Sequence, residues 1–234
     1  MTKPSAPRTA RARVREELTR EIKKAAGRQL ADVGSAALSL RAVARELGMA
    51  SSAVYRYFPS RDELLTALII DAYDAIGAAA ETAEAAVDRA DHLGRWIAAT
   101  AGARVWAVAN PQEYALIFGS PVPGYQAPRT TVDPAARIPL LALRILGDAT
   151  QAGAVRTTGE SSLPGSVRAD LEALRDLVAP GLSDQQLARA LMAWTQLIGS
   201  ISFELFGHLH NVIHDYETYF NFQMRNIGHA LGLA

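Results

Sequence analysis

Residues 39–65 read SLRAVARELGMASSAVYRYFPSRDELL. Within them, Ala44, Gly48 and Val54 have the spacing A-x3-G-x5-V that a helix-turn-helix needs for its packing. The alanine is small where the two helices cross, and the glycine can adopt the left-handed conformation of a tight turn. The valine fills the angle between the helices. The pattern therefore predicts a helix-turn-helix with one short helix on either side of Gly48.

The ends of these helices can be read from the same stretch. Ser39 is a good N-cap for the first helix, and the second is expected over residues 50–58 because a proline follows. Ala50 has no capping side chain, so either Ser51 caps the second helix one residue later or its first turn is less well held. Ser60 is expected to cap a long helix with acids in its first turn, where the helix dipole favours them.

A longer helix and a basic charge precede this stretch. Apolar residues recur every three or four positions from residue 13 to residue 33, and Gly34 ends the helix. Residues 1–61 carry thirteen Lys and Arg against five Asp and Glu, a net charge of +8, and the other 173 residues carry −8. A basic head on an acidic body is suited to a polyanion such as DNA. Residues 1–12 are predicted to form a flexible basic arm, either a plain tail or a minor-groove contact.

Helical periodicity continues to the end of the chain, and no segment has a convincing strand pattern. The predicted fold class is all-α, with nine or ten helices. An N-terminal three-helix helix-turn-helix domain is expected over residues 13–60, and a larger helical ligand-sensing and dimerisation domain over residues 61–234. The N-caps expected for four later helices are Asn110, Asp133, Ser183 and Asp215.

The motif resembles the DNA-binding signature of the TetR family of bacterial repressors. The most specific part is VYRYF at 54–58 followed by SRDELL at 60–65. The resemblance implies that Arg41 reaches DNA from the start of its helix, that three residues of the next helix face the bases, and that Tyr55, Tyr57 and Arg61 contact phosphates. Tyr57 could equally be a half-buried core aromatic. The candidate DNA-binding residues are Arg41, Ser51, Ser52, Ala53, Tyr55, Arg56, Tyr57 and Arg61.

This resemblance implies a function. We expect a sequence-specific transcriptional regulator, a repressor, that binds a palindromic operator in double-stranded DNA as a homodimer. Two recognition helices would then enter successive major grooves. A small, mainly apolar effector would release the protein from DNA. The alternatives are a DNA-binding protein without a sensor domain and an enzyme.

Aromatic side chains of the larger domain are the candidates for effector binding. Ligand sites between helices are built from such side chains, but aromatics at helical spacing are more often plain core. The candidate ligand-binding residues are Trp96, Trp106, Tyr114, Phe118, Trp194 and Phe203.

The last two helices are expected to form the dimer interface as a four-helix bundle. An apolar stripe and nearby small residues suit a close approach of two helices. The stripe consists of Leu187, Leu191, Trp194, Leu197, Ile198, Ile201 and Leu205; the small residues are Gly199, Ser200 and Ser202, and the final helix adds Tyr219, Phe222, Met224 and Ile227.

Several function classes are disfavoured by what the sequence lacks. Without cysteine there is no disulfide, thiolate zinc site or cysteine nucleophile. No apolar run reaches the roughly 18 residues of a membrane span, and no signal peptide is evident, so a cytoplasmic protein is expected. The only residues with metal-ligand character are Glu204, His208, His210, His214 and Asp215, without an H-E-x-x-H arrangement. We therefore expect no metal, no cofactor and no enzyme activity.

Overall fold

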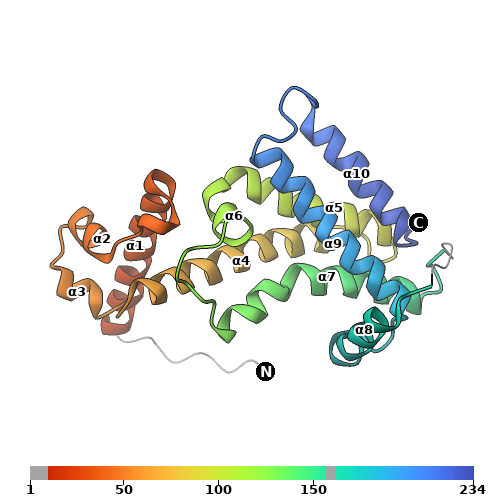
Figure 1. The fold of residues 1–234 in the computed structure, drawn as a ribbon, viewed down its shortest axis with the longest axis horizontal. Helices are drawn as coiled ribbons and strands as arrows, with labels where there is room; N and C mark the ends of the chain where they lie inside the picture. The colour runs from red at the N-terminus through yellow and green to blue at the C-terminus, as the bar shows by residue number, and fades with distance from the viewer. Residues whose placement is uncertain (1–9, 157–161) are drawn as a thin grey trace.

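The computed structural model describes residues 10–156 and 162–234, and within these ranges the chain forms ten α-helices, two 3-10 turns and no strand. The predicted all-α fold class is therefore confirmed. Figure 1 shows a small head of α1–α3 at one end of the molecule, joined to the larger body by the long helix α4. The head helices are α1 (Ala10–Val33), α2 (Leu40–Glu46) and α3 (Ser51–Tyr55), followed by α4 (Arg61–Ala85). The body helices are α5 (His92–Ala109), α6 (Pro111–Phe118), α7 (Val132–Gln151), α8 (Gly165–Val178), α9 (Asp184–Leu205) and α10 (Tyr216–Ala230).

The first helix begins earlier than the sequence indicates. Helix α1 starts at Ala10, so residues 10–12 of the predicted arm are helical. The rest of that arm, residues 1–9, lies outside the described residues. Gly34 ends α1 as expected, with a positive φ of 75° that suits a glycine.

Three of the predicted N-caps are confirmed by their hydrogen bonds. The Ser60 hydroxyl accepts the amide of Glu63 at 3.1 Å at the start of α4. The Asp215 carboxylate accepts the amide of Thr218 at 3.0 Å at the start of α10. Ser183 forms a full capping box at the start of α9, because its hydroxyl and the Gln186 side chain each accept the other residue's backbone amide.

Three other predicted caps are wrong in detail. Ser39 precedes α2 as expected, but its side chain makes no capping hydrogen bond. Asn110 precedes α6 as expected, but its side-chain amide donates to the carbonyl of Trp106 at 2.8 Å instead of accepting a hydrogen bond from α6. Asp133 lies inside the first turn of α7, whose N-cap is Thr131. A 3-10 turn at Arg129–Thr131 leads directly into α7, so the helix begins before the Asp133–Pro134 signal.

The core of the head extends past the predicted domain boundary at residue 60. Buried residues of α1, α2 and α3 pack against the first three turns of α4. Helix α4 contributes Leu64, Leu65, Leu68 and Ile69. The same helix continues into the body, so one element belongs to both cores.

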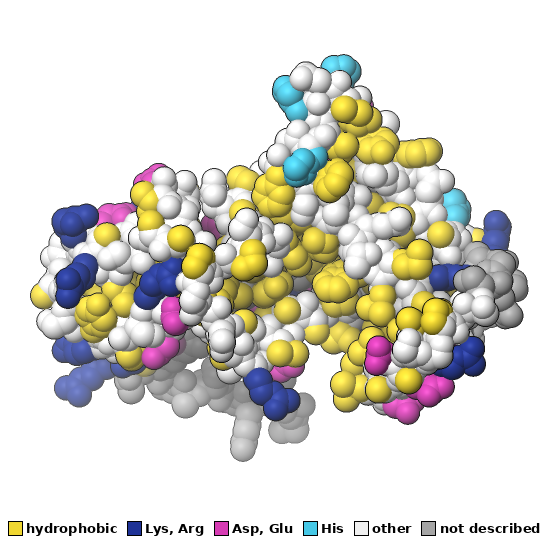
Figure 2. All heavy atoms as spheres, viewed as in Figure 1, with side chains coloured by type: hydrophobic (Ala, Val, Ile, Leu, Met, Phe, Trp, Pro, Cys, Tyr) yellow, Lys and Arg dark blue, Asp and Glu magenta, His cyan; other side chains and the backbone are white. Residues whose placement is uncertain are grey.

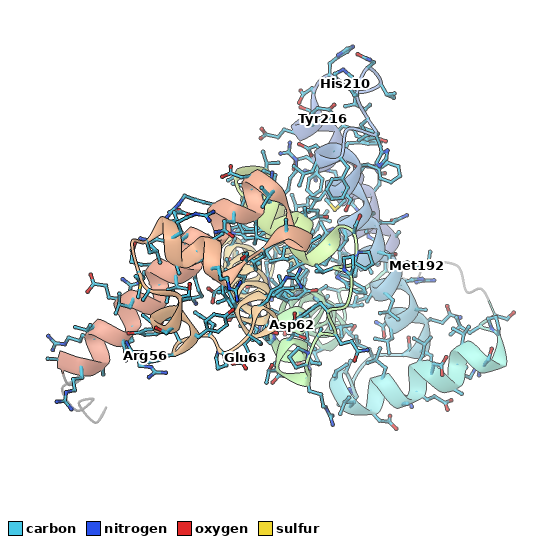
Figure 3. All side chains as sticks on the ribbon, turned by 60° about the vertical axis from the view of Figure 1, so that its left-hand side comes forward. Arg56, Asp62, Glu63, Met192, His210 and Tyr216 are labelled. Carbon is cyan, nitrogen blue, oxygen red and sulfur yellow. The ribbon has the colours of Figure 1, made fainter. Side chains whose placement is uncertain are left out.

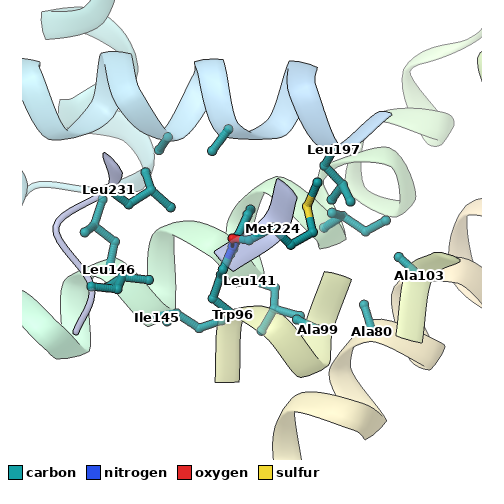
Figure 4. Close-up of a cluster of buried hydrophobic side chains, with 14 of the residues drawn as sticks. Ala80, Trp96, Ala99, Ala103, Leu141, Ile145, Leu146, Leu197, Met224 and Leu231 are labelled. Carbon is teal, nitrogen blue, oxygen red and sulfur yellow. Dashed lines mark hydrogen bonds between the residues drawn. The ribbon is translucent and has the colours of Figure 1, made fainter. Parts of the chain in front are cut away.

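The body core surrounds Trp96 of α5, which is 2% exposed. Its indole N–H donates to the carbonyl of Met224 in α10 at 2.8 Å, which satisfies its polar atom in an apolar environment. Figure 4 shows side chains of α4, α5, α7, α9 and α10 meeting there. The labelled residues are Ala80, Trp96, Ala99, Ala103, Leu141, Ile145, Leu146, Leu197, Met224 and Leu231.

An ionic network is buried beside this core. The guanidinium of Arg95, which is 0% exposed, bonds Glu84 at 2.6 Å and Asp148 at 2.7 Å. Arg89 bonds the same two carboxylates at 2.6 Å each from the solvent side. The network joins the end of α4 to α5 and α7, and burial makes the pairing of Arg95 with Glu84 obligatory.

Replacing Arg95 with methionine is expected to lower the free energy of unfolding by about 3 kcal/mol, because Glu84 then loses its buried partner. Arg89→Met is the matched control and is expected to cost less than about 1 kcal/mol, since Arg89 is 59% exposed. Urea unfolding at one fixed protein concentration measures both. Equal losses in the two variants would contradict this interpretation of the network.

Candidate nucleic-acid interface

The turn of the helix-turn-helix has the geometry that the sequence predicts. Gly48 has a φ of 64°, in the left-handed region. The amide of Met49 donates to the carbonyl of Ala44 at 2.8 Å and that of Gly48 to the carbonyl of Arg45 at 3.2 Å, which together form a Schellman motif. Ala44 and Val54 are 1% and 0% exposed. The predicted packing around the turn is therefore confirmed.

Helix α3 begins at Ser51 with Ala50 as N-cap, and no side chain caps it. The sequence left two alternatives open, a cap at Ser51 or a first turn that is less well held, and the second is found. The first turn is closed by the backbone hydrogen bond from the Ala53 amide to the Ala50 carbonyl, at 2.9 Å. The helix ends at Tyr55, earlier than predicted. The amides of Tyr57 and Phe58 still bond the carbonyl of Val54, so a turn continues beyond the helix.

The eight candidate DNA-binding residues come from α2, α3, the turn after it and the first residue of α4. Arg41, Ser52, Tyr55 and Arg56 are exposed, whereas the other four are partly buried. Figure 3 shows Arg56 on the outer side of the head, away from the body. Figure 2 shows that Lys and Arg side chains gather over the head. The partly buried candidates are Ser51, Ala53, Tyr57 and Arg61.

Two of the candidates also make contacts within the head. The guanidinium of Arg61 donates to the carbonyls of Ser35 at 2.7 Å and Ala36 at 3.3 Å, across the turn that follows α1. The Tyr57 ring lies under the guanidinium of Arg15, 5.5 Å from its centre, and packs against the head core. No local sequence signal points to the Arg61 contacts, because the acceptors lie 26 and 25 residues away.

The six aromatic ligand candidates do not share one cavity. Trp96 and Tyr114 are buried core residues, 2% and 0% exposed. The Tyr114 hydroxyl lies 2.8 Å from the Ser202 hydroxyl and donates to the Ile198 carbonyl at 2.9 Å. Burial raises the pKa of Tyr114 to about 12, so the hydroxyl is neutral. Trp194 is half-buried against the body core.

The other three candidates line three separate hollows. Trp106 lines a cleft of about 580 Å³ between the head and the body. Phe118 lines a hollow of about 430 Å³ between the end of α1 and α6. Phe203 lines a groove of about 660 Å³ on the outer side of α9 and α10. Only the first two of these sites adjoin the head.

The structure changes the predicted dimer interface on α9 and α10. Leu187, Leu197 and Ile201 are buried within their own subunit, so the prediction that they form the interface is wrong for them. Gly199 and Ser200 of α9 are partly buried and line the groove, whereas the Ser202 hydroxyl contacts Tyr114 inside the body. Of the predicted α10 residues, Met224 is buried, whereas the others line the groove: Tyr219, Phe222 and Ile227.

The histidine region does not form a metal site in the described part of the chain. Glu204 is paired with Arg104 through two hydrogen bonds of 2.7 Å, which occupy its carboxylate. The centre of the His208 ring lies 5.0 Å from that of the Phe203 ring, with the two rings tilted at 53°. Figure 3 shows His210 at the tip of the α9–α10 hairpin near Tyr216. No group of three or more metal-ligand side chains occurs in residues 10–156 and 162–234. Across the same residues, no helix has the length and apolar character needed to cross a bilayer.

Comparison with known proteins is consistent with this architecture. Residues 22–68 match the family model "Bacterial regulatory proteins, tetR family", and residues 96–227 match "Tetracyclin repressor-like, C-terminal domain". The HTH-type transcriptional regulators Rv1816 of Mycobacterium tuberculosis and Mb1846 of Mycobacterium bovis are each 42% identical over 198 residues, which is 82% of this chain and 82% of theirs. The solved structure of SCO4313 is 34% identical, with a TM-score of 0.76 over 95% of this chain and 98% of that one.

Replacing Gly48 with alanine is expected to lower the free energy of unfolding by about 1 kcal/mol, because a Cβ disfavours the left-handed conformation. Gly27→Ala is the control. Gly27 lies within α1 and its added Cβ meets no atom within 4 Å, so helix propensity should raise stability by about 0.5–1 kcal/mol. Thermal unfolding at fixed concentration measures both. Stabilisation by Gly48→Ala would contradict the role assigned to the turn.

Proposed function

Because this chain belongs to the TetR family of bacterial regulatory proteins and is a DNA-binding transcriptional regulator, we propose that it is a repressor controlled by a small, mainly apolar effector. In this proposal a homodimer binds a palindromic operator, and effector binding releases it. The observation that carries the proposal is the exposed cationic and polar surface of α2 and α3 on a head whose turn is held by Gly48.

The proposed contacts divide into two kinds. Ser51, Ser52 and Ala53 lie in the first turn of α3, where small side chains let the backbone approach base edges in the major groove. Arg41 and Arg56 are exposed cations suited to phosphate oxygens, which fix the position of the protein on DNA. We propose phosphate contacts for Tyr55, Tyr57 and Arg61 as well, with Arg61 also holding the turn after α1.

Dimerisation is proposed through the outer faces of α9 and α10. Phe203 of α9 and Phe222 of α10 are 53% and 60% exposed and line the groove, and Gly199 and Ser200 of α9 line it as well. Exposed aromatics beside small residues suit the close packing of two helix pairs. A two-fold axis along this groove would bring the same surface of each subunit together and would pair two heads for two half-sites.

The effector must bind one head arrangement better than the other, or operator affinity cannot change. Of the aromatic candidates, Trp106 and Phe118 line hollows that border the head. We propose that these two are the ligand-accessible members of the set, with Trp96, Tyr114 and Trp194 acting mainly in the core and Phe203 at the dimer surface. Because the proposed target is chromosomal DNA, we place the protein in the bacterial cytoplasm.

Replacing Arg56 with alanine is expected to weaken operator binding by about tenfold or more, because each head of the dimer loses a charged contact. The slope of affinity against salt should fall as phosphate contacts are lost. The operator is first selected from random duplex DNA, and affinity is then measured by fluorescence anisotropy. Arg41→Ala should behave in the same way.

Arg144→Ala is the matched control, because Arg144 is exposed on α7 in the body. Its operator affinity should stay within about twofold of the unmodified protein, since it contacts no DNA in this proposal. An equal loss in Arg144→Ala and Arg56→Ala would indicate non-specific attraction. Failure to enrich any palindrome would refute the proposed operator.

Replacing both Phe203 and Phe222 with glutamate is expected to convert the dimer to monomers, because four charges would be buried at the two-fold interface. Light scattering after size-exclusion chromatography measures the mass. Val105→Glu is the control, since Val105 is 64% exposed on α5 outside the groove. A double variant that remains dimeric would place the interface elsewhere.

A further inference from the structure

A cleft of about 580 Å³ separates the first helix of the head from the body. One wall is α1, the opposite wall is α4, and the end of α5 and the start of α6 close it; Figure 1 shows these elements beside one another. Its volume lies within the range of about 300–1,000 Å³ that is usual for small-molecule sites. The cleft is distinct from the groove between α9 and α10.

The inner surface of the cleft is largely apolar. Leu68 and Ala72 of α4 and Leu116 of α6 form part of it, and the half-buried ring of Trp106 contributes an aromatic surface. Gly27 of α1 faces the space without a side chain, and a Cβ placed there would meet no atom within 4 Å. These surfaces can accept a flat ring or a short alkyl chain.

The rim of the cleft is cationic. Four cationic side chains of α1 line the cleft together with two acidic ones, Asp71 and Glu113. The residues that line the cleft therefore have a net charge of +2. Lys23 is paired with Asp71 across the cleft at 2.5 Å, and Lys24 is paired with Glu21 at 3.2 Å. Both pairs are partly exposed, so an incoming anion can compete for these cations at little cost. The four cations are Arg20, Lys23, Lys24 and Arg28.

We propose that this cleft binds a small amphipathic anion, with its apolar part against Trp106 and Leu116 and its carboxylate or sulfonate beside Lys23 and Lys24. The bound anion competes with Asp71 for Lys23, the cation that links α1 to α4. This proposal makes the effector of the proposed function more specific: a mainly apolar molecule that carries one negatively charged group. Its consequence for DNA rests on the repressor function proposed above.

The surroundings of the cleft explain why its occupancy affects the head. Leu30 of α1 and Leu116 of α6 line both this cleft and the neighbouring hollow of about 430 Å³. The end of α1 therefore rests on α6 along a narrow contact with open space on both sides. A ligand that fills only one side favours one position of α1 over others, which is the differential binding that a switch requires.

The test uses two fluorescent probes that differ in one charged group: anilinonaphthalene sulfonate and its neutral counterpart, phenylnaphthylamine. Both are titrated into the full-length protein without DNA. The Lys23→Gln/Lys24→Gln variant is expected to bind the sulfonate at least about tenfold more weakly and the neutral probe within about twofold, because only the charge interaction is lost. Arg11→Gln/Arg13→Gln, with the same charge loss elsewhere on α1, should leave both affinities unchanged.

Gly27→Leu fills the cleft from α1 and is expected to weaken both probes by at least about tenfold, while its thermal unfolding shows that the variant is folded. Sulfonate binding that is unaffected by Gly27→Leu would overturn the proposal. Loss of sulfonate binding in Phe222→Glu instead would also overturn it, because that result places the probe in the α9–α10 groove.

The titrations contain no DNA, so failure of operator binding cannot be confused with failure of the cleft. With the titrations as expected, operator affinity is measured with and without saturating sulfonate probe. A changed affinity that Gly27→Leu abolishes supports both proposals. An unchanged affinity contradicts the ligand-controlled switch, whereas the cleft assignment is supported by the titrations themselves.

Discussion

Helix α4 is the constraint on which the rest of the molecule depends, because one rigid helix belongs to two cores. Its first turns place Leu64 and Leu65 in the head core, and its later turns place Ile76 and Ala80 in the body core. An uninterrupted α-helix bends little. A change in the direction of α4 at the head therefore requires its other end, in the body, to move as well. The body end is held by the buried pair of Glu84 with Arg95.

A second ionic cluster fixes the middle of α4. Arg137 of α7 bonds Glu81 at 2.6 Å and both the side chain and the carbonyl of Asp74, and this pairing lowers the pKa of Glu81. Arg137 crosses α4 at Gly77, where a Cβ would come within 2.9 Å of the arginine side chain. The α4–α7 contact is therefore tight, whereas the α1–α6 contact lies between two hollows. The head is therefore joined to the body by a closely packed connection through α4 and by a less closely packed one between α1 and α6.

The sequence predicts those features whose causes are local. The conformation at Gly48 and the cap at Ser183 depend on neighbours within a few residues, and both are found. The hydrogen bond from Arg61 to the Ser35 carbonyl spans 26 residues, and the pair of Arg104 with Glu204 spans 100, so no spacing rule could find them. Helical periodicity shows that a face is apolar without showing what that face contacts. The apolar stripe of α9 therefore predicts an interface, although Leu187, Leu197 and Ile201 of that stripe pack inside their own subunit.

The basic side chains of the head are divided between two surfaces: the α1 surface that lines the cleft, and the exposed surface of α2 and the turn after α3. The net charge of +8 over residues 1–61 is therefore not the charge of one surface. Lys23, Lys24 and Arg28 lie on the α1 surface that lines the cleft, and each is paired with an acid. Arg41 and Arg56 are exposed on α2 and just after α3. Total charge therefore overstates the part of the head that is available to DNA. In the proposed function Arg41 and Arg56 face DNA, whereas the α1 cations line the cleft on the side of the body. The anion proposed for the cleft would therefore reduce the positive potential of the head as well as favour one position of α1.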